Sequence, residues 1–402
     1  MWDCRGKRMP LHPNNELLKR KLESLPLLDN RFSNLKLVNF SEEDDRKRGC
    51  FSMVFRAHDT AENKTVALKF FDLDPRWRND VYRINSFKRE HEILQGLLNV
   101  DRCLQLASAL STCTIEETID GVPGVSFSAD YFAVDWLSDE IDSYFLAQGD
   151  FGPIEKLKIF NEIVLAVETL HSHEVFHRDL KADNLRAHEA AVKRMVIAID
   201  LGTAARFDSD CISTTYGHSV GAHAYAAPEA ICGLAGNRTL APFTDYYALG
   251  CMLFELFNPD YFFQAVRNWN RNFDLRLCAM AGELSGVSGR MQEVESWDAV
   301  VRRFGVGVTP VAIDGDGSSL PKGISKILNE LLEVLTHIDY KKRKAPPNWI
   351  RQKLWTAIRV LENEAEYARR LRFTRERRER RERAARDKEA RLAAARLTSL
   401  PC

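Results

Sequence analysis

The stretch that most constrains this chain runs from His177 to Asn184 and reads H-R-D-L-K-A-D-N. Sixteen residues after Asn184, an apolar run from Met195 to Ile199 ends in Asp200-Leu201-Gly202. This spacing predicts that two carboxylates, an amide and a lysine meet around one small site. Carboxylate and amide oxygens bind Mg²⁺ and a lysine can hold phosphate, so the pattern favours phosphoryl transfer from a metal-bound nucleotide.

The composition is typical of a folded chain that is long enough for two lobes, since 45% of its 402 residues are hydrophobic and 28% are charged. Its nine cysteines are scattered, with no C-x-x-C pair, which predicts reduced thiols rather than a zinc site. The N-terminus lacks the pattern of a secretory signal, and no segment has the ~20 apolar residues that a membrane span needs. We therefore expect a cytoplasmic protein.

The net charge of +0 hides a basic tail, because residues 364–396 contain 13 Lys or Arg and 7 Asp or Glu. This tail is expected to be a helix with ion pairs one turn apart, such as Glu376 with Arg380 and Glu379 with Arg383. Two readings of it stay open. It is a solvated helix, or it docks on nucleic acid or on an acidic partner.

The order of predicted elements separates a β-rich part from a helical part. Strands are expected near residues 35–38, 50–57, 65–71, 104–117 and 126–136, with one helix at 84–98. Helices are expected from Pro153 to about Leu170, over 245–257 with Thr244 as N-cap, and over 324–335. The histidines at 171, 173 and 218 are expected at the surface or at helix ends.

Further motifs follow in order along the chain: V-A-L-K at 66–69, A-P-E at 227–229 and D-Y-Y-A-L-G at 245–250. Together with H-R-D-x-x-x-x-N they resemble the Hanks-type, eukaryotic-like serine/threonine protein kinases over residues 35 to 355. The resemblance implies a bilobal α+β fold. Its expected parts are an N-terminal extension (1–33), a β-rich N-lobe (34–136), a helical C-lobe (137–361) and a charged tail (362–402).

The same resemblance implies a role for each motif residue. Asp179 would be the catalytic base and Lys181 the cation near the transferred phosphate, with Asn184 and Asp200 as ligands of Mg²⁺. Lys69 would hold the phosphates of ATP and pair with Glu90, for which Glu92 is a competing choice. Further expected ATP-binding residues are Gly49, Val54, Ala67, Asp135 and Leu137.

Three other residues are expected to support the structure, and three to belong to regulation. Glu229 would pair with Arg343, and Asp245 would anchor the backbone of the catalytic loop. Arg178 would receive a phosphate on the activation segment, for which we expect autophosphorylation at Thr214 or Thr215.

Three positions depart from the pattern of this family. Gly49 alone remains of the usual three loop glycines, Arg186 stands where an aliphatic floor for adenine is typical, and Ala222 replaces a threonine whose hydroxyl would bond the catalytic residues. These departures leave a pseudokinase, a binding or scaffold module without turnover, as the alternative. The A-P-E motif and Arg343 argue against a small-molecule kinase, so the sequence favours transfer from ATP to Ser/Thr hydroxyls of a protein.

Overall fold

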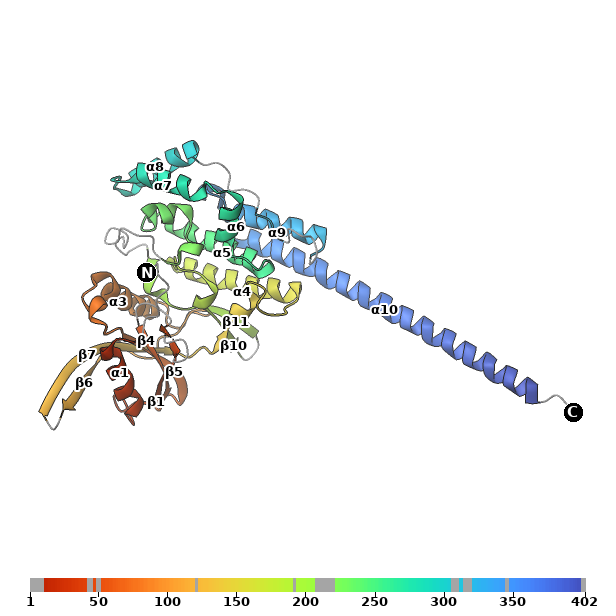
Figure 1. The fold of residues 1–402 in the computed structure, drawn as a ribbon, viewed down its shortest axis with the longest axis horizontal. Coiled ribbons are helices and arrows are strands. Elements are labelled where there is room, and N and C mark those ends of the chain that lie inside the picture. The colour runs from red at the N-terminus through yellow and green to blue at the C-terminus, as the bar shows by residue number, and fades with distance from the viewer. Residues whose placement is uncertain are drawn as a thin grey trace.

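The computed structural model describes residues 11–41, 46–47, 52–119, 122–190, 193–206, 221–304, 311–313, 320–343 and 347–398. Its smaller lobe is built on a five-stranded antiparallel sheet in the order β1-β4-β5-β7-β6 (Figure 1). The strands are β1 (Phe32–Leu37), β4 (Ser52–Asp59), β5 (Lys64–Phe71), β6 (Ser111–Ile119) and β7 (Val122–Asp135). Short strands β2 (Phe40–Ser41) and β3 (Arg46–Lys47) pair beside it.

Two longer helices and one short helix accompany this sheet: α1 (Pro13–Ser24), α2 (Pro75–Arg78) and α3 (Val81–Gly96). Helix α3 begins where the side chain of Asp80 accepts the backbone N–H of Tyr82, as an N-cap does. Helix α1 places Leu18 and Leu22 in the same buried cluster as Phe55 and Phe70 of the sheet. Residues 11–33 therefore contribute to the core of the small lobe.

The larger lobe is mainly helical (Figure 1). Its long helices are α4 (Pro153–Ser172), α5 (Ala241–Phe257), α6 (Phe262–Trp269), α7 (Phe273–Leu284), α8 (Arg290–Phe304), α9 (Lys322–Leu335) and α10 (Pro347–Thr398). Its strands are β8 (Asp139–Glu140), β9 (Val175–Phe176), β10 (Leu185–Ala190), β11 (Lys193–Ala198) and β12 (Ala205–Arg206). The expected bilobal α+β fold is confirmed.

One predicted helix start is wrong. Helix α5 begins at Ala241 after the N-cap position Leu240, so Thr244 lies inside the helix. The physical reason is Pro242, whose fixed φ suits a first helical turn and lets the helix begin earlier. The hydroxyl of Thr244 instead donates to the carbonyl of Ala241, 2.6 Å away.

The core of the large lobe surrounds α5, in which Leu249, Met252 and Leu253 are fully buried. The same cluster extends to Phe87 and Leu94 of α3, so it links the two lobes. Helix α10 packs its first turns against α4 and α9 and then leaves the body (Figure 1). Among the described residues, no helix is both long enough and apolar enough to cross a membrane.

Candidate active site

The catalytic loop between β9 and β10 is anchored from below by Asp245 of α5. One carboxylate oxygen accepts the backbone N–H of His177 and the other that of Arg178, both at 2.8 Å. The ring of His171 lies 2.8 Å from the same carboxylate, which is 1% exposed. Burial opposes the charge of Asp245, but these groups hold its pKa below the ordinary value. The loop backbone is thereby fixed to the most buried helix.

His171 was predicted to lie at the surface or at a helix end, and the helix end is confirmed, because the residue is in the last turn of α4. Its side chain is 12% exposed and contacts the rings of Phe176 and Tyr246 as well as Asp245. The histidine follows the last apolar residues of α4, so it lies near the helix end but faces inward. The sequence signal that was available is its place six residues before His177 on the helix that leads to the loop.

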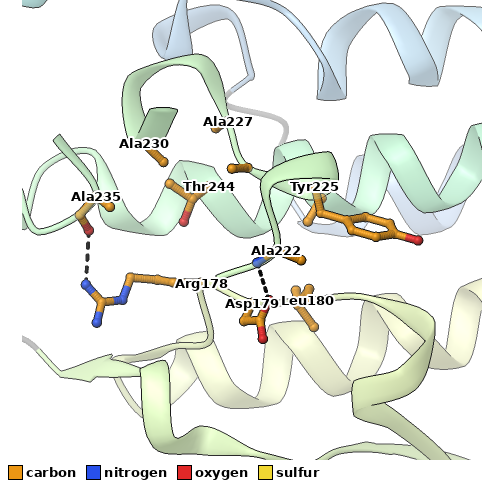
Figure 2. Close-up of a pocket in the computed structure, with 11 residues that line it drawn as sticks. Arg178, Asp179, Leu180, Ala222, Tyr225, Ala227, Ala230, Ala235 and Thr244 are labelled. Atoms are coloured by element: carbon orange, nitrogen blue, oxygen red, sulfur yellow. Dashed lines mark hydrogen bonds between the residues drawn. The ribbon is translucent and has the colours of Figure 1, made fainter. Parts of the chain in front are cut away.

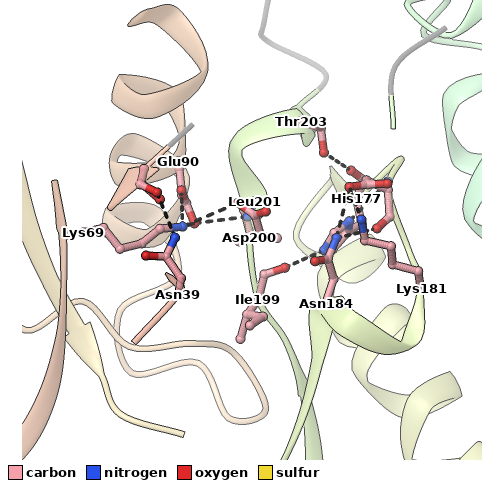
Figure 3. Close-up of polar contacts among 12 residues, drawn as sticks. Asn39, Lys69, Glu90, His177, Lys181, Asn184, Ile199, Asp200, Leu201 and Thr203 are labelled. Carbon is pink, nitrogen blue, oxygen red and sulfur yellow. Dashed lines mark hydrogen bonds and ion pairs between the residues drawn. The ribbon is translucent and has the colours of Figure 1, made fainter. Parts of the chain in front are cut away.

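Asp179 is held by three groups around its carboxylate and carbonyl (Figures 2 and 3). The backbone N–H of Ala222 donates to Oδ1 at 2.6 Å, and the amide of Asn184 donates to Oδ2 at 3.1 Å and to the carbonyl at 2.8 Å. Lys181 Nζ lies 3.7 Å from Oδ2. Burial raises the pKa of Asp179 although Lys181, His177 and Ala222 oppose this. The missing hydroxyl of residue 222 is thus offset by a backbone donor.

Gly221 permits this contact because it brings two backbone segments unusually close. Its φ is +83°, and a Cβ added there would lie 2.4 Å from the carbonyl oxygen of Arg178. Only glycine adopts this conformation freely and leaves that space empty. Figure 2 shows Ala222 directly above Asp179, and Ala227, Ala230 and Ala235 line the same small pocket.

On the facing side of the site, Lys69 of β5 pairs with Glu90 of α3 (Figure 3). Its Nζ lies 2.6 and 2.7 Å from the two carboxylate oxygens of Glu90 and 3.4 Å from Asp200 Oδ1. Glu90 also accepts the backbone N–H of Leu201 at 3.2 Å. The structure therefore selects Glu90 over Glu92 and joins the small lobe to the Asp200 segment.

Burial opposes every charge of this cluster, and in Glu90 it outweighs Lys69 and raises the pKa of the carboxyl. Burial opposes the ammonium of Lys69, but Glu90 and Asp200 outweigh it and raise the pKa of the lysine. Burial likewise opposes the charge of Asp200, yet Lys69, His177 and Lys181 hold the pKa of its carboxyl below the ordinary value. Asp200 is therefore ionised at neutral pH. Its side chain is 35% exposed, so this carboxylate is accessible to a cation.

Asp200 and Asn184 fit the chemistry of a magnesium site. Both offer oxygen atoms, which Mg²⁺ prefers as ligands. The segments that carry them are joined directly, because the backbone N–H of Ile199 donates to the carbonyl of Asn184 at 2.9 Å. His177 Nε2 lies 2.9 Å from the carbonyl of Ile199 and fixes the same junction (Figure 3).

Arg343 and Arg178, expected to serve the structure and the activation segment respectively, are both buried. Arg343 forms two hydrogen bonds with Glu229, at 2.9 and 2.6 Å, and both side chains are 0% exposed. Arg178 donates to the carbonyls of Thr203 and Ala235, the second of which Figure 2 shows. Thr214 and Thr215 lie outside the described residues, so their predicted phosphorylation stays a prediction.

The predicted ATP-binding residues are placed in part. Val54 and Ala67 lie on the adjacent strands β4 and β5, and Asp135 ends β7, where it pairs with Lys64 at 2.9 Å. Leu137 packs against the main core. Gly49 lies outside the described residues.

Arg186, at the expected adenine floor, is held by nearby polar groups. It donates to the carbonyls of Asp183 and Leu185, and it lies 3.5 Å from Glu140. These contacts occupy its guanidinium at the start of β10.

Asn39 is a residue near the site that the sequence reasoning missed. Its side chain bonds the carbonyl of Ser52 at 3.0 Å and the N–H of Val54 at 2.9 Å, and so supports the strand that faces Lys69 (Figure 3). A lone asparagine after a predicted strand gives no signal of such a contact.

Comparison with known proteins agrees with this geometry. A family model described as protein kinase domain matches residues 47–355. Serine/threonine-protein kinase PrkC of Bacillus subtilis is 29% identical over 210 residues, which are 52% of this chain and 28% of that protein. CBL-interacting protein kinase 5 of Oryza sativa is also 29% identical over 210 residues, 52% of this chain and 40% of that protein. The matched parts are thus less than half of these relatives. The model nevertheless covers most of the present chain, which belongs to the protein kinase domain family.

Proposed function

We propose that this chain transfers the γ-phosphoryl group of ATP to Ser or Thr hydroxyls of protein substrates, with Mg²⁺. The observation that carries the proposal is the assembled Lys69–Glu90 pair, 3.4 Å from Asp200, opposite an Asp179 that Ala222 and Asn184 orient. A site with these groups in place needs no rearrangement of its acidic and basic side chains before it binds nucleotide. The names of PrkC and CBL-interacting protein kinase 5 support the Ser/Thr class.

In the proposed reaction Asp179 orients the acceptor hydroxyl and takes up its proton as the oxygen attacks the γ-phosphorus. The bond from that phosphorus to the β,γ-bridging oxygen breaks, and ADP leaves. Lys69 holds the α- and β-phosphates, and Lys181 offsets charge on the transferred group. Bound to Asp200 and Asn184, Mg²⁺ would neutralise phosphate charge.

The pseudokinase alternative rested on the altered glycine loop, Ala222 and Arg186. The amide contact from Ala222 to Asp179 weakens one of these three reasons. The guanidinium of Arg186 is held by the carbonyls of Asp183 and Leu185. We therefore favour an active enzyme.

The deciding measurement is transfer of labelled γ-phosphate from ATP with Mg²⁺, to the chain itself and to a generic basic substrate. The wild type should be labelled, and Asp179→Ala and Lys69→Ala should not. The chemistry of the labelled residue then separates Ser/Thr from Tyr. An unlabelled wild type whose thermal stability still rises with ATP would support the pseudokinase instead.

Autophosphorylation at Thr214 or Thr215 is a further part of the proposal. Arg178 lies directly before Asp179, so a phosphate at the activation segment would act next to the catalytic base. Phosphopeptide mapping of an active preparation should find one of the two threonines modified. A fully active preparation without phosphate in this segment would remove this part and leave the transfer activity untouched.

A cytoplasmic location and a partner for the basic tail both stay predictions. The matching family model ends at residue 355, so it says nothing about the tail.

A further inference from the structure

Helix α10 divides into a packed part and a free-standing part. Leu354, Ala357 and Ile358 are fully buried, and Lys158 of α4 reaches Glu362 at 2.9 Å. From residue 362 to residue 384 every side chain that the structure describes is exposed. Figure 1 shows this part projecting far beyond the body. The second part is therefore reachable from every side.

The projecting helix has a high positive charge, and all of its cations between residues 369 and 384 are arginines. Residues 369–384 contain nine arginines, three glutamates and no lysine, a net charge of +6. The glutamates pair with the arginine one turn before them: Arg372 with Glu376, Arg375 with Glu379 and Arg378 with Glu382. The sequence predicted pairs with the arginine one turn after. Both directions occur in this helix, because Arg370 pairs with Glu366 one turn before it.

The excess charge lies on one side of the helix. At 3.6 residues per turn, positions 369, 370, 373, 377, 380 and 381 fall within about a third of the circumference. This basic face contains Arg369, Arg370, Phe373, Arg377, Arg380 and Arg381, and no acidic residue between 369 and 384. The remaining, mixed face carries the three glutamates and the other four arginines; Glu379 and Glu382 lie opposite the basic face, and Glu376 lies at its edge beside Arg369.

We propose that the basic face binds the phosphate backbone of double-stranded nucleic acid. The guanidinium group matches phosphate with two parallel hydrogen bonds. The face runs straight for roughly 18 Å at 1.5 Å per residue, and a duplex presents one negative charge per ~1.7 Å of its axis over any such length. A long, regular polyanion therefore meets all five arginines at once.

Nucleic acid fits better than an acidic protein for two reasons. The face offers only one large apolar side chain, Phe373, which is 67% exposed, whereas a protein interface normally has a desolvated apolar centre. In addition, no described part of the body adjoins the projecting part of the helix to complete a compact interface (Figure 1). Binding through phosphates needs neither feature. The inference does not depend on the proposed transfer activity.

The experiment uses the full chain and two matched variants. The basic-face variant is Arg369→Gln, Arg377→Gln, Arg380→Gln and Arg381→Gln, and the mixed-face variant is Arg372→Gln, Arg375→Gln, Arg378→Gln and Arg383→Gln. Each removes four positive charges from the same segment. Fluorescence anisotropy with a labelled duplex of about 20 base pairs gives affinity at several salt concentrations, and circular dichroism checks the helix.

We expect the basic-face variant to lose at least about tenfold in affinity at low salt and to lower the salt slope by about 3 to 4. The mixed-face variant should lose less than about threefold. Equal losses in both helical variants would overturn the proposal. So would wild-type protein that binds an anionic vesicle or a polyglutamate peptide as tightly as the duplex.

Discussion

Two buried ion pairs, Arg343–Glu229 and Lys69–Glu90, have nearly the same geometry and different neighbours. In both, the nitrogen lies 2.6 Å from a carboxylate oxygen. Arg343 and Glu229 are completely buried, and the arginine also donates to the carbonyls of Phe243 and Ile338. Lys69 is 9% exposed and faces the accessible carboxylate of Asp200.

The comparison distinguishes Arg343–Glu229, which stabilises the fold, from Lys69–Glu90, which is placed to contact a ligand. Every contact of Arg343 named above lies within the large lobe. Its charge therefore acts on the stability of the fold and has no position from which to contact a ligand. Lys69 and Glu90 come from different elements of the small lobe and reach the Asp200 segment of the large lobe. Their position beside the accessible carboxylate of Asp200 suits the binding of a ligand.

The largest effect on activity is expected from breaking the pair of Lys69 with Glu90. Lys69→Met should lower kcat/KM for peptide phosphorylation by roughly 10²–10³, because a preorganised charge on the phosphates is lost. The measurement is steady-state transfer from ATP at fixed Mg²⁺. Lys36→Met is a matched control, since Lys36 is an exposed lysine of the same sheet, on β1. Similar losses in both variants would contradict the role of Lys69.

Breaking the first pair should act on stability instead. Arg343→Met leaves the Glu229 carboxylate buried without a cation, which costs about 3–5 kcal/mol of unfolding free energy. Denaturant unfolding measures it. The double variant Arg343→Met, Glu229→Met should recover most of the loss, because both buried charges are then gone. A double variant as unstable as the single one would show that the bonds to Phe243 and Ile338, and not the charge, dominate.

The sequence predicted the features that depend on residues close together in the chain, and it missed those that depend on long-range packing. The Lys69, Glu90, Asp179 and Asp200 positions follow short motifs in a fixed order, and the structure brings these residues together. The start of α5 was misjudged because two capping signals, Thr244 and Pro242, compete within three residues. The burial of His171 depends on where α5 crosses α4. Such long-range packing has no signature in the neighbouring residues.

A third buried glutamate, Glu255, has no cationic partner among the described residues. It accepts the hydroxyl of Tyr225 at 2.6 Å and the N–H of Phe262 at 3.3 Å. Burial raises its pKa from 4.5 to about 7, although both bonds oppose this. It extends the comparison to a buried carboxyl whose hydrogen-bond partners, a tyrosine hydroxyl and a backbone N–H, are both neutral.

The sign follows from proton binding. Between pH 4.5 and about 7 the folded chain holds a proton on Glu255 that the unfolded chain has released, so this group's contribution to stability falls as pH rises through that window. The loss is about 3 kcal/mol at most, at 1.36 kcal/mol per pKa unit. Glu255→Gln has no such proton to lose. The unfolding free energy of the variant should therefore rise relative to that of the wild type from pH 5 to 7. Above pH 7 the difference between the two should stay constant. A constant difference at every pH would contradict the raised pKa.

The smallest effect is expected where the site depends on backbone rather than charge. Ala222 has φ −74° and ψ 121°, which proline can adopt. Ala222→Pro removes the N–H that orients Asp179 and places a ring carbon in its direction, so kcat should fall about tenfold with little change in KM for ATP. Ala222→Ser keeps the donor and should stay near the wild type. If the proline variant folds and retains full kcat, the Lys69–Glu90 side of the site carries the orientation of the reactants, and the Ala222 contact only accompanies it.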